Sequence, residues 1–147
     1  MKKIIISTLF SIVYVFCAAQ SESDIFGEWF NEEKDAVVTI YKDGNSISGK
    51  TTWLKEPLDS KGNAKLDLKN PDEKLRSRKR MGLKIMHSFK YNDQENIWED
   101  GRIYDPKKGK LYGGTASLVN ENELKLKGYI ISMPFLGRTA TWTRKTN

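Results

Sequence analysis

Cysteine is nearly absent from this sequence: Cys17 is the only one in 147 residues. Long apolar runs are equally scarce, because the longest covers residues 4–16 and falls short of the roughly 20 residues that a helix needs to span a bilayer. Two lysines precede this run and small residues follow it, as in a secretory signal peptide. We therefore expect residues 1–19 to be a signal peptide, cleaved before Gln20, and the protein to be periplasmic or secreted.

The expected mature chain, residues 20–147, contains no cysteine. This excludes a disulfide, a thiol nucleophile and a thiolate metal site. A lipid-bearing Cys17 is disfavoured, because its processing needs a small residue where Phe16 stands. The single histidine, His87, has no second soft ligand beside it, and catalytic zinc takes three protein ligands. We expect no metal and no cofactor.

Signatures of the common enzyme classes are missing as well. The sequence has no Gly-x-Ser-x-Gly, no His-Glu-x-x-His and no phosphate-binding glycine loop. Glu99 and Asp100 would point to opposite faces of one strand, which is wrong for joint acid–base catalysis. The net charge of +6 is mild and does not by itself indicate nucleic acid. We assign no catalytic residue and expect no nucleic-acid partner; a hydrolase or isomerase is the least favoured class.

What the sequence does contain is a series of strand patterns joined by short turns. The clearest is a hairpin over residues 97–118, whose turn combines Asp105, Pro106 and Gly109. The segments that we expect to be strands are residues 25–30, 36–41, 47–54, 83–91, 97–104, 110–118, 123–131 and 137–145. They predict one all-β domain, an eight-stranded up-and-down antiparallel barrel, because closure removes exposed strand edges. A two-sheet β-sandwich alternates in the same way and stays open as an alternative.

One connection, residues 55–82, is much longer than the others. Structureless connections of this length are uncommon unless they are functional or disordered. The segment is basic, with cations at Lys74, Arg76, Arg78, Lys79 and Arg80. It is either a solvated loop or a lid over the barrel mouth whose cations would attract an anionic head group or an anionic membrane surface.

Candidates for contact with a small molecule lie on two of the expected strands. Alternation over residues 83–91 places Ile85, His87, Phe89 and Tyr91 on one face and Met86 on the other. His87 is then either a core histidine or a ligand contact. The complete set of candidates is Trp53, His87, Phe89, Tyr91, Trp98, Arg102, Tyr104 and Arg138.

Residues 97–104 carry the most unusual face. Alternation places Trp98, Asp100, Arg102 and Tyr104 together. If this face is inward, Arg102 and Tyr104 would give the cavity a cation and a hydroxyl suited to a carboxylate or phosphate. If it is outward, the same residues are solvated neighbours. The sequence leaves both orientations open.

The two ends of the expected barrel resemble those of lipocalins and related calycin barrels. In such barrels a tryptophan plugs the narrow end and a basic residue of the last strand packs across it. Gly27-x-Trp29 and Trp142-x-Arg144 match this pattern. The resemblance implies a structural closure by these four residues, in which an arginine over an indole ring contributes on the order of 1 kcal/mol.

The chain is also similar to the DUF2147 family of uncharacterised exported bacterial proteins. The matching segments are Gly27-Glu28-Trp29, Ser48-Gly49-Lys50 with Trp53-Leu54, Asp67 with Asn70-Pro71, Arg76-x-Arg78 leading to Gly82, Trp98-x-x-Gly101-x-Ile103-Tyr104-Asp105-Pro106, Gly109-Lys110-x-Tyr112, Leu126-x-Gly128-Tyr129, and Leu136-Gly137-Arg138-Thr139. This resemblance implies a lipocalin-like barrel outside the cytoplasm and no particular reaction.

Two functions from different classes are consistent with these features. The first is an exported binding or carrier barrel for a small hydrophobic or amphipathic ligand that bears an anionic group. The second is a structural or interaction module of the cell envelope whose barrel is filled by its own side chains. Cavity volume separates them, since a binding site for a small molecule takes about 300 Å³ or more.

Overall fold

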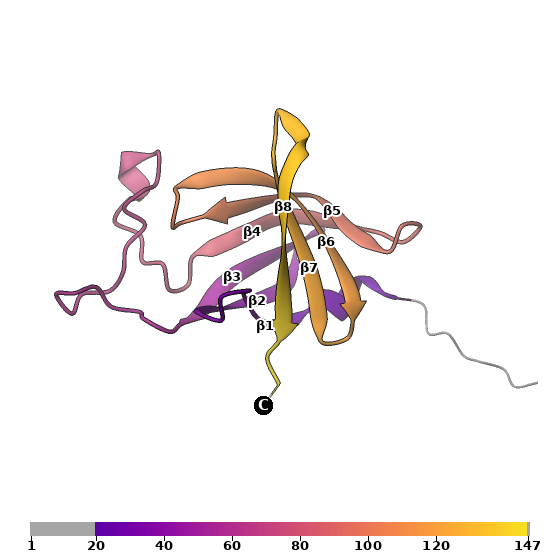
Figure 1. Cartoon of the computed structure of the whole chain (residues 1–147), viewed down its shortest axis with the longest axis horizontal. Coiled ribbons are helices and arrows are strands. Elements are labelled where there is room, and N and C mark those ends of the chain that lie inside the picture. The colour runs from indigo at the N-terminus through magenta and orange to yellow at the C-terminus, as the bar shows by residue number, and fades with distance from the viewer. Residues whose placement is uncertain (1–19, 147) are drawn as a thin grey trace, which may run out of the picture.

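The protein, described here by a computed structural model over residues 20–146, is a closed barrel of eight antiparallel strands in chain order (Figure 1). The strands are β1 (Gly27–Phe30), β2 (Ala36–Asp43), β3 (Ser46–Leu54), β4 (Lys84–Asn92), β5 (Ile97–Asp105), β6 (Lys110–Asn120), β7 (Glu123–Ile130) and β8 (Met133–Arg144). Two short 3-10 helices, η1 (Glu22–Ile25) and η2 (Glu73–Leu75), complete the secondary structure. Pairing of β1 with β8 closes the barrel, so the barrel prediction is confirmed and the open-sandwich alternative is wrong.

Two predictions concern the amino terminus and membranes. The expected signal peptide, residues 1–19, lies outside the described residues. Within residues 20–146, no helix has the length and apolar character needed to cross a bilayer.

Because neighbouring strands are antiparallel, the barrel has two ends of different construction. The open end carries the β1–β2, β3–β4, β5–β6 and β7–β8 connections, and the closed end carries η1 and the remaining connections. In Figure 1 the long β3–β4 connection projects at the left and the β7–β8 connection rises at the top, while the β4–β5 turn and residue 20 lie at the right.

Large apolar side chains fill the half of the barrel beneath η1. Trp29, Phe89 and Trp98 are completely buried in one cluster with aliphatic residues of five strands. Gly101 and Gly114 lie directly against the Phe89 ring, and a Cβ atom at Gly101 would come within 2.4 Å of it. The glycines of β5 and β6 therefore make the space that the ring occupies.

Bulged backbone in the middle of β4 and β5 changes which side chains face the interior. Ser88 and Asp100 both have positive φ, of 57° and 58°. Each such residue shifts the alternation of its strand by one position, since the next side chain no longer follows the two-residue period. As a result Met86 and Phe89 are both in the core, and the predicted alternation over residues 83–91 is wrong.

The same irregularity corrects the predicted face of residues 97–104. Trp98 is a core residue, but after Asp100 it is Gly101 that packs against the core residue Phe89. Register between β5 and β6 shifts at this point. Trp98 and Arg102 therefore do not share a face, and Asp100 is exposed beside Lys90.

The long connection between β3 and β4 is anchored to the barrel by a buried polar cluster. The Tyr104 hydroxyl donates to Oδ1 of Asp67 at 2.6 Å, and the Asn70 amide donates to Oδ2 of Asp67 at 2.8 Å. Arg78 completes the cluster with an ion pair of 3.0 Å to the same carboxylate. Asp67 is fully buried, so this segment is not simply a solvated loop.

Candidate ligand-binding site at the open end

Two adjoining hollows occupy the open half of the barrel. One has a volume of about 490 Å³ and is bounded by β5 to β8, with Tyr112, Leu126 and Ala140 among its lining residues. The other, of about 460 Å³, lies between β2 to β5 and the start of the long connection. Both include Ile103 and Trp142, which form the wall between them. The barrel is thus filled at one end and hollow at the other.

Small side chains leave room in the first hollow. Gly128 lies on the inner face of β7, and a Cβ atom there would sit 3.8 Å from Cβ of Tyr112 and 3.9 Å from Cδ1 of Ile103. These are ordinary contact distances, in contrast to the 2.4 Å at Gly101. A Cβ atom at Gly128 would therefore fit without displacing its neighbours.

Charged residues ring the mouth, and most are paired. Lys107 contacts Asp35 at 2.7 Å, and Arg138 forms an ion pair with Glu32. Burial raises the pKa of Asp35, but the hydrogen bonds from Lys107 and Asn31 outweigh it and leave that pKa below its usual value. The Asp35 carboxylate therefore stays ionised at neutral pH.

Three charged side chains that line the hollows have no oppositely charged group within 4.0 Å in the described part of the chain: Glu33, Lys55 and Arg80. The Arg80 guanidinium donates to the carbonyls of Leu66 and Pro106, both at 3.1 Å, and lines the second hollow. The Glu33 carboxylate accepts only from the Asn31 amide at 3.0 Å and lines both hollows. A polar ligand group would meet two cations, Lys55 and Arg80, and one anion, Glu33, here.

Of the eight predicted contact residues, Tyr104 and Arg138 line these hollows. Tyr104 also holds the long connection, and burial together with the bond to Asp67 raises its pKa to about 12. Arg138 lies at the rim, paired with Glu32. The remaining six, which lie elsewhere, are Trp53, His87, Phe89, Tyr91, Trp98 and Arg102.

Phe89, Tyr91 and Trp98 belong to the filled half. The Trp98 ring packs on Tyr91 with 5.1 Å between ring centroids, and its indole N–H donates to the carbonyl of Glu22 in η1. The Tyr91 hydroxyl donates to the carbonyl of Gln20 at 2.7 Å. These residues close the barrel in the structure, and the prediction that they bind a ligand stays untested.

Trp53, His87 and Arg102 lie apart from both hollows. Trp53 is partly exposed and contacts Phe30 edge-on. The Arg102 guanidinium donates to the carbonyl of its neighbour Gly101. In the register of β4 and β5, Arg102 lies opposite His87. Burial, followed by the charge of Lys84, lowers the pKa of His87, so the imidazole is neutral at pH 7. Arg102 is therefore not placed to bind an anion inside the barrel.

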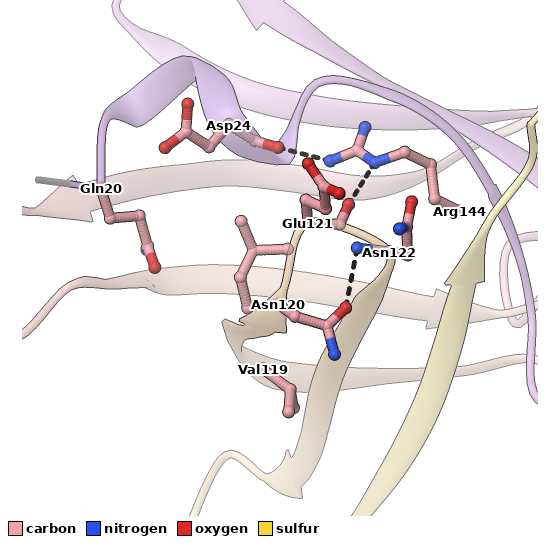
Figure 2. A pocket seen from close by; sticks show the side chains of 8 residues that line it. Gln20, Asp24, Val119, Asn120, Glu121, Asn122 and Arg144 are labelled. Carbon is pink, nitrogen blue, oxygen red and sulfur yellow. Dashed lines mark hydrogen bonds between the residues drawn. The ribbon is translucent and has the colours of Figure 1, made fainter. Parts of the chain in front are cut away.

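The closed end has the contact that the sequence predicts. The Arg144 guanidinium lies 4.2 Å from the centre of the Trp29 ring, and it donates to the carbonyls of Phe26 at 2.8 Å and Asp24 at 2.7 Å. Figure 2 shows it reaching toward Asp24 and Glu121, and all three residues line a hollow of about 530 Å³. Burial lowers the pKa of Arg144, which still remains charged. Trp142, in contrast, belongs to the wall of the ligand hollows.

Sequence reasoning missed most of the residues that line the hollows. Ile103, Tyr112, Leu126 and Trp142 are central to them. A usable signal was the apolar face of residues 124–130, interrupted by a glycine at its centre. In residues 20–146, no group of three or more histidine, cysteine or acidic side chains is arranged to hold a metal ion.

A closed eight-stranded barrel, capped by an arginine over a tryptophan and hollow at its other end, defines a lipocalin-like protein. A solved structure titled "Protein HP1028 from the human pathogen Helicobacter pylori belongs to the lipocalin family" superimposes with a TM-score of 0.63 and 20% identity, over 76% of this chain and 73% of that one. The profile of the bacterial family described as "Uncharacterized protein conserved in bacteria (DUF2147)" matches residues 27–144, so the chain belongs to this family. None of the curated proteins matches it.

Proposed function

We propose that the protein is an exported barrel that binds a small, partly apolar molecule in the two hollows of its open end. The observation that carries the proposal is their position inside the barrel: both are lined by Ile103 and by the core residue Trp142, and each exceeds the roughly 300 Å³ that small-molecule sites occupy. Eight-stranded barrels have room for one small ligand, and the similarity of fold to a lipocalin-family structure is consistent with such use.

The lining suggests where each part of a ligand would lie. An apolar body would pack against Tyr112, Leu126 and Trp142 in the first hollow. An anionic group would meet Arg80, whose charge faces the second hollow and is compensated only by backbone carbonyls. Arg80 thus replaces Arg102 as the proposed anchor, and Glu33 restricts where the anionic group can lie.

Two fluorescent probes test this proposal without knowledge of the natural ligand. N-phenylnaphthylamine is apolar and uncharged, whereas anilinonaphthalene sulfonate is of similar size and anionic. We expect both to bind, to quench the fluorescence of Trp142 and to compete with each other. Arg80→Met should lower the affinity for the anionic probe by about tenfold, as expected for loss of a partly desolvated charge pair. The affinity for the neutral probe should not change. Lys79→Met is the matched control.

Filling the hollow gives a second test. Gly128→Val adds a Cβ atom in ordinary contact with Tyr112 and Ile103 and two methyl groups at the lining of the first hollow, and we expect it to weaken binding of both probes by at least tenfold with stability retained. Lys127→Val, at the exposed neighbouring position of the same strand, should leave both affinities within a factor of about two. Equal affinities in the two variants would show that the probes bind elsewhere.

The alternative function, an envelope interaction module with a filled barrel, is favoured by the closed half alone, where Trp29, Phe89 and Trp98 leave no space. Absence of saturable probe binding to the wild-type protein would favour it.

The cations of the long connection are also proposed to face an anionic membrane surface. Arg76 and Arg78 form ion pairs within the connection and Arg80 lines the second hollow, so Lys74 and Lys79 carry most of this attraction.

A further inference from the structure

The β7–β8 connection carries an exposed apolar surface that ligand binding inside the barrel does not explain. Phe135 is 80% exposed, and four neighbours are each at least two-fifths exposed; together these five residues, which we call the apolar tip, are Ile130, Ile131, Met133, Phe135 and Leu136. No charged side chain occurs between Lys127 and Arg138. The tip projects beyond the barrel at the top of Figure 1. Apolar patches of this kind mark interaction sites.

The apolar tip is part of a wider asymmetry between the two ends. In the described part of the chain, large exposed apolar side chains are concentrated at the open end, where Leu58, Leu68 and Met81 of the long connection accompany the tip. Val119, beside the β6–β7 turn, is the exception at the closed end. The exposed apolar surface therefore faces one way.

Charge is distributed along the same axis. At the closed end, residues 20–26, 44–45, 93–96, 121–122 and 144–146 include five acidic and two basic side chains. At the open end, residues 55–82 alone include nine basic and five acidic side chains. An anionic surface would thus attract the open end and repel the closed end, which orients the molecule with the apolar tip forward.

We propose that the open end docks on an anionic phospholipid bilayer, with the apolar tip inserted at the level of the headgroups and the acidic closed end directed away. A narrow hairpin tip fits this role better than a protein interface, since a specific protein contact buries about 800 Å² on each partner and this tip is convex and small. Insertion transfers Phe135 and Met133 out of water, and the cations of the long connection contact the headgroups.

Docking in this way has a consequence for the hollows, and this step rests on the proposed function. Ile130 and Leu136 belong to the apolar tip and also line the first hollow. The mouth of the hollow would therefore face the bilayer surface. An apolar molecule could pass between the bilayer and the barrel along a continuous apolar path.

Vesicle binding tests the docking directly. Vesicles of phosphatidylcholine with phosphatidylglycerol, and of phosphatidylcholine alone, are mixed with the full chain and floated on a density gradient. We expect binding to the mixed vesicles that weakens as salt rises, and Phe135→Ser should lower the partition coefficient at least about tenfold. Val119→Ser removes an exposed apolar side chain at the opposite end of the barrel and should change the partition coefficient less than about twofold. Both variants retain residues 1–19, so their difference isolates the tip.

The insertion depth is read from a second variant. Phe135→Trp adds an indole at the most exposed position, and its emission, obtained by difference from wild type, should shift to the blue on mixed vesicles and be quenched by brominated lipid. Equal partitioning of Phe135→Ser and Val119→Ser would overturn the proposal. So would a wild-type protein that ignores vesicles but forms a dimer that Phe135→Ser abolishes, which would identify a protein partner instead.

The two proposals can fail separately. Gly128→Val should lose probe binding and keep vesicle binding, whereas Phe135→Ser should lose vesicle binding and keep its affinity for N-phenylnaphthylamine. Loss of both properties in either variant would indicate misfolding, which circular dichroism and the denaturation midpoint detect. In that case Lys74→Glu with Lys79→Glu replaces Phe135→Ser: it should abolish the preference for phosphatidylglycerol, and an unchanged preference would overturn the docking orientation.

Discussion

The closed and open halves of this barrel are made from the same strands, but their interiors are packed differently. Toward η1, side chains from opposite walls meet, and Phe89 fills the centre against bare glycine backbone. Toward the long connection, Gly128 and Ala140 face the hollow of about 490 Å³, and the hollow of about 460 Å³ adjoins it. The comparison teaches that one half supplies stability and the other supplies space, with Trp142 and Ile103 at the boundary.

The largest expected effect comes from adding one methyl group to each half. Gly101→Ala places a Cβ atom 2.4 Å from the Phe89 ring and should lower the free energy of unfolding by about 3 kcal/mol, as overpacking does. Gly128→Ala should stay within about 1 kcal/mol of wild type, since the atom meets only ordinary contacts. Urea denaturation measures both. Equal midpoints would show that the two halves are packed alike.

Removing one arginine from each end gives the next largest difference. Arg144→Ala should cost about 1–3 kcal/mol, because it removes a cation–π contact with Trp29 and leaves the carbonyls of Asp24 and Phe26 without their donor. Arg138→Ala removes a largely exposed pair with Glu32 and should cost less than about 0.5 kcal/mol. A denaturation midpoint for Arg144→Ala that matches wild type would show that the closure is not stabilising.

The anchor of the long connection is tested by Tyr104→Phe. The change removes the hydroxyl that donates to the buried Asp67 and should cost about 1–2 kcal/mol. Tyr112→Phe, in the lining of the first hollow, should be close to neutral. Because the pKa of Tyr104 is raised from 10.0 to about 12, the unfolded chain loses this proton first, and stability should fall as pH rises from 10 to 12. Tyr104→Phe should lose that part of the pH dependence.

His87 gives the smallest effect. Its pKa lies below the reference value of 6.5, so the unfolded state binds a proton before the folded state does as the pH falls. Stability should therefore decrease as pH falls through 6.5 toward the lowered pKa, a range in which His87 is the only histidine to titrate. His87→Gln should flatten this slope in thermal melts between pH 7.5 and 5.5, roughly the range in which histidine titrates. An identical slope would assign it to other groups.

The sequence predicts the strands and the closure well, for physical reasons that are local. Turn residues such as Asp105, Pro106 and Gly109 set the hairpins, and Trp29 with Arg144 anticipates the contact between the chain's ends. Side-chain orientation is less predictable, because it depends on backbone that no local pattern reveals. Ser88 and Asp100 are ordinary strand residues by composition, yet both have positive φ. The bulge at Asp100 moves Arg102, on the same strand, away from the interior.

Long-range burial is the second limit. From the sequence, Asp67 and Asn70 are typical of a self-contained turn. Only their hydrogen bonds with Tyr104, 34 residues or more along the chain, show that they anchor the long connection. The hollows follow the same rule. Trp142 lines them because β8 pairs with β7 in a register that sets Trp142 opposite Leu124 and Ala140 opposite Leu126, a relation that the separate strand patterns do not specify.

Pairing of the first strand with the last also determines the order in which the protein can assemble. β1 has only β2 as a partner until β8 arrives, since Trp29 pairs with Arg144 at the far end of the chain. Contacts of such sequence separation form late, because the intervening chain must first be ordered. We therefore expect an emerging chain to present the edge of β1 as a template for wrong pairing until its final residues are released. A chain that stops before Arg144 should aggregate rather than fold as a slightly weaker barrel.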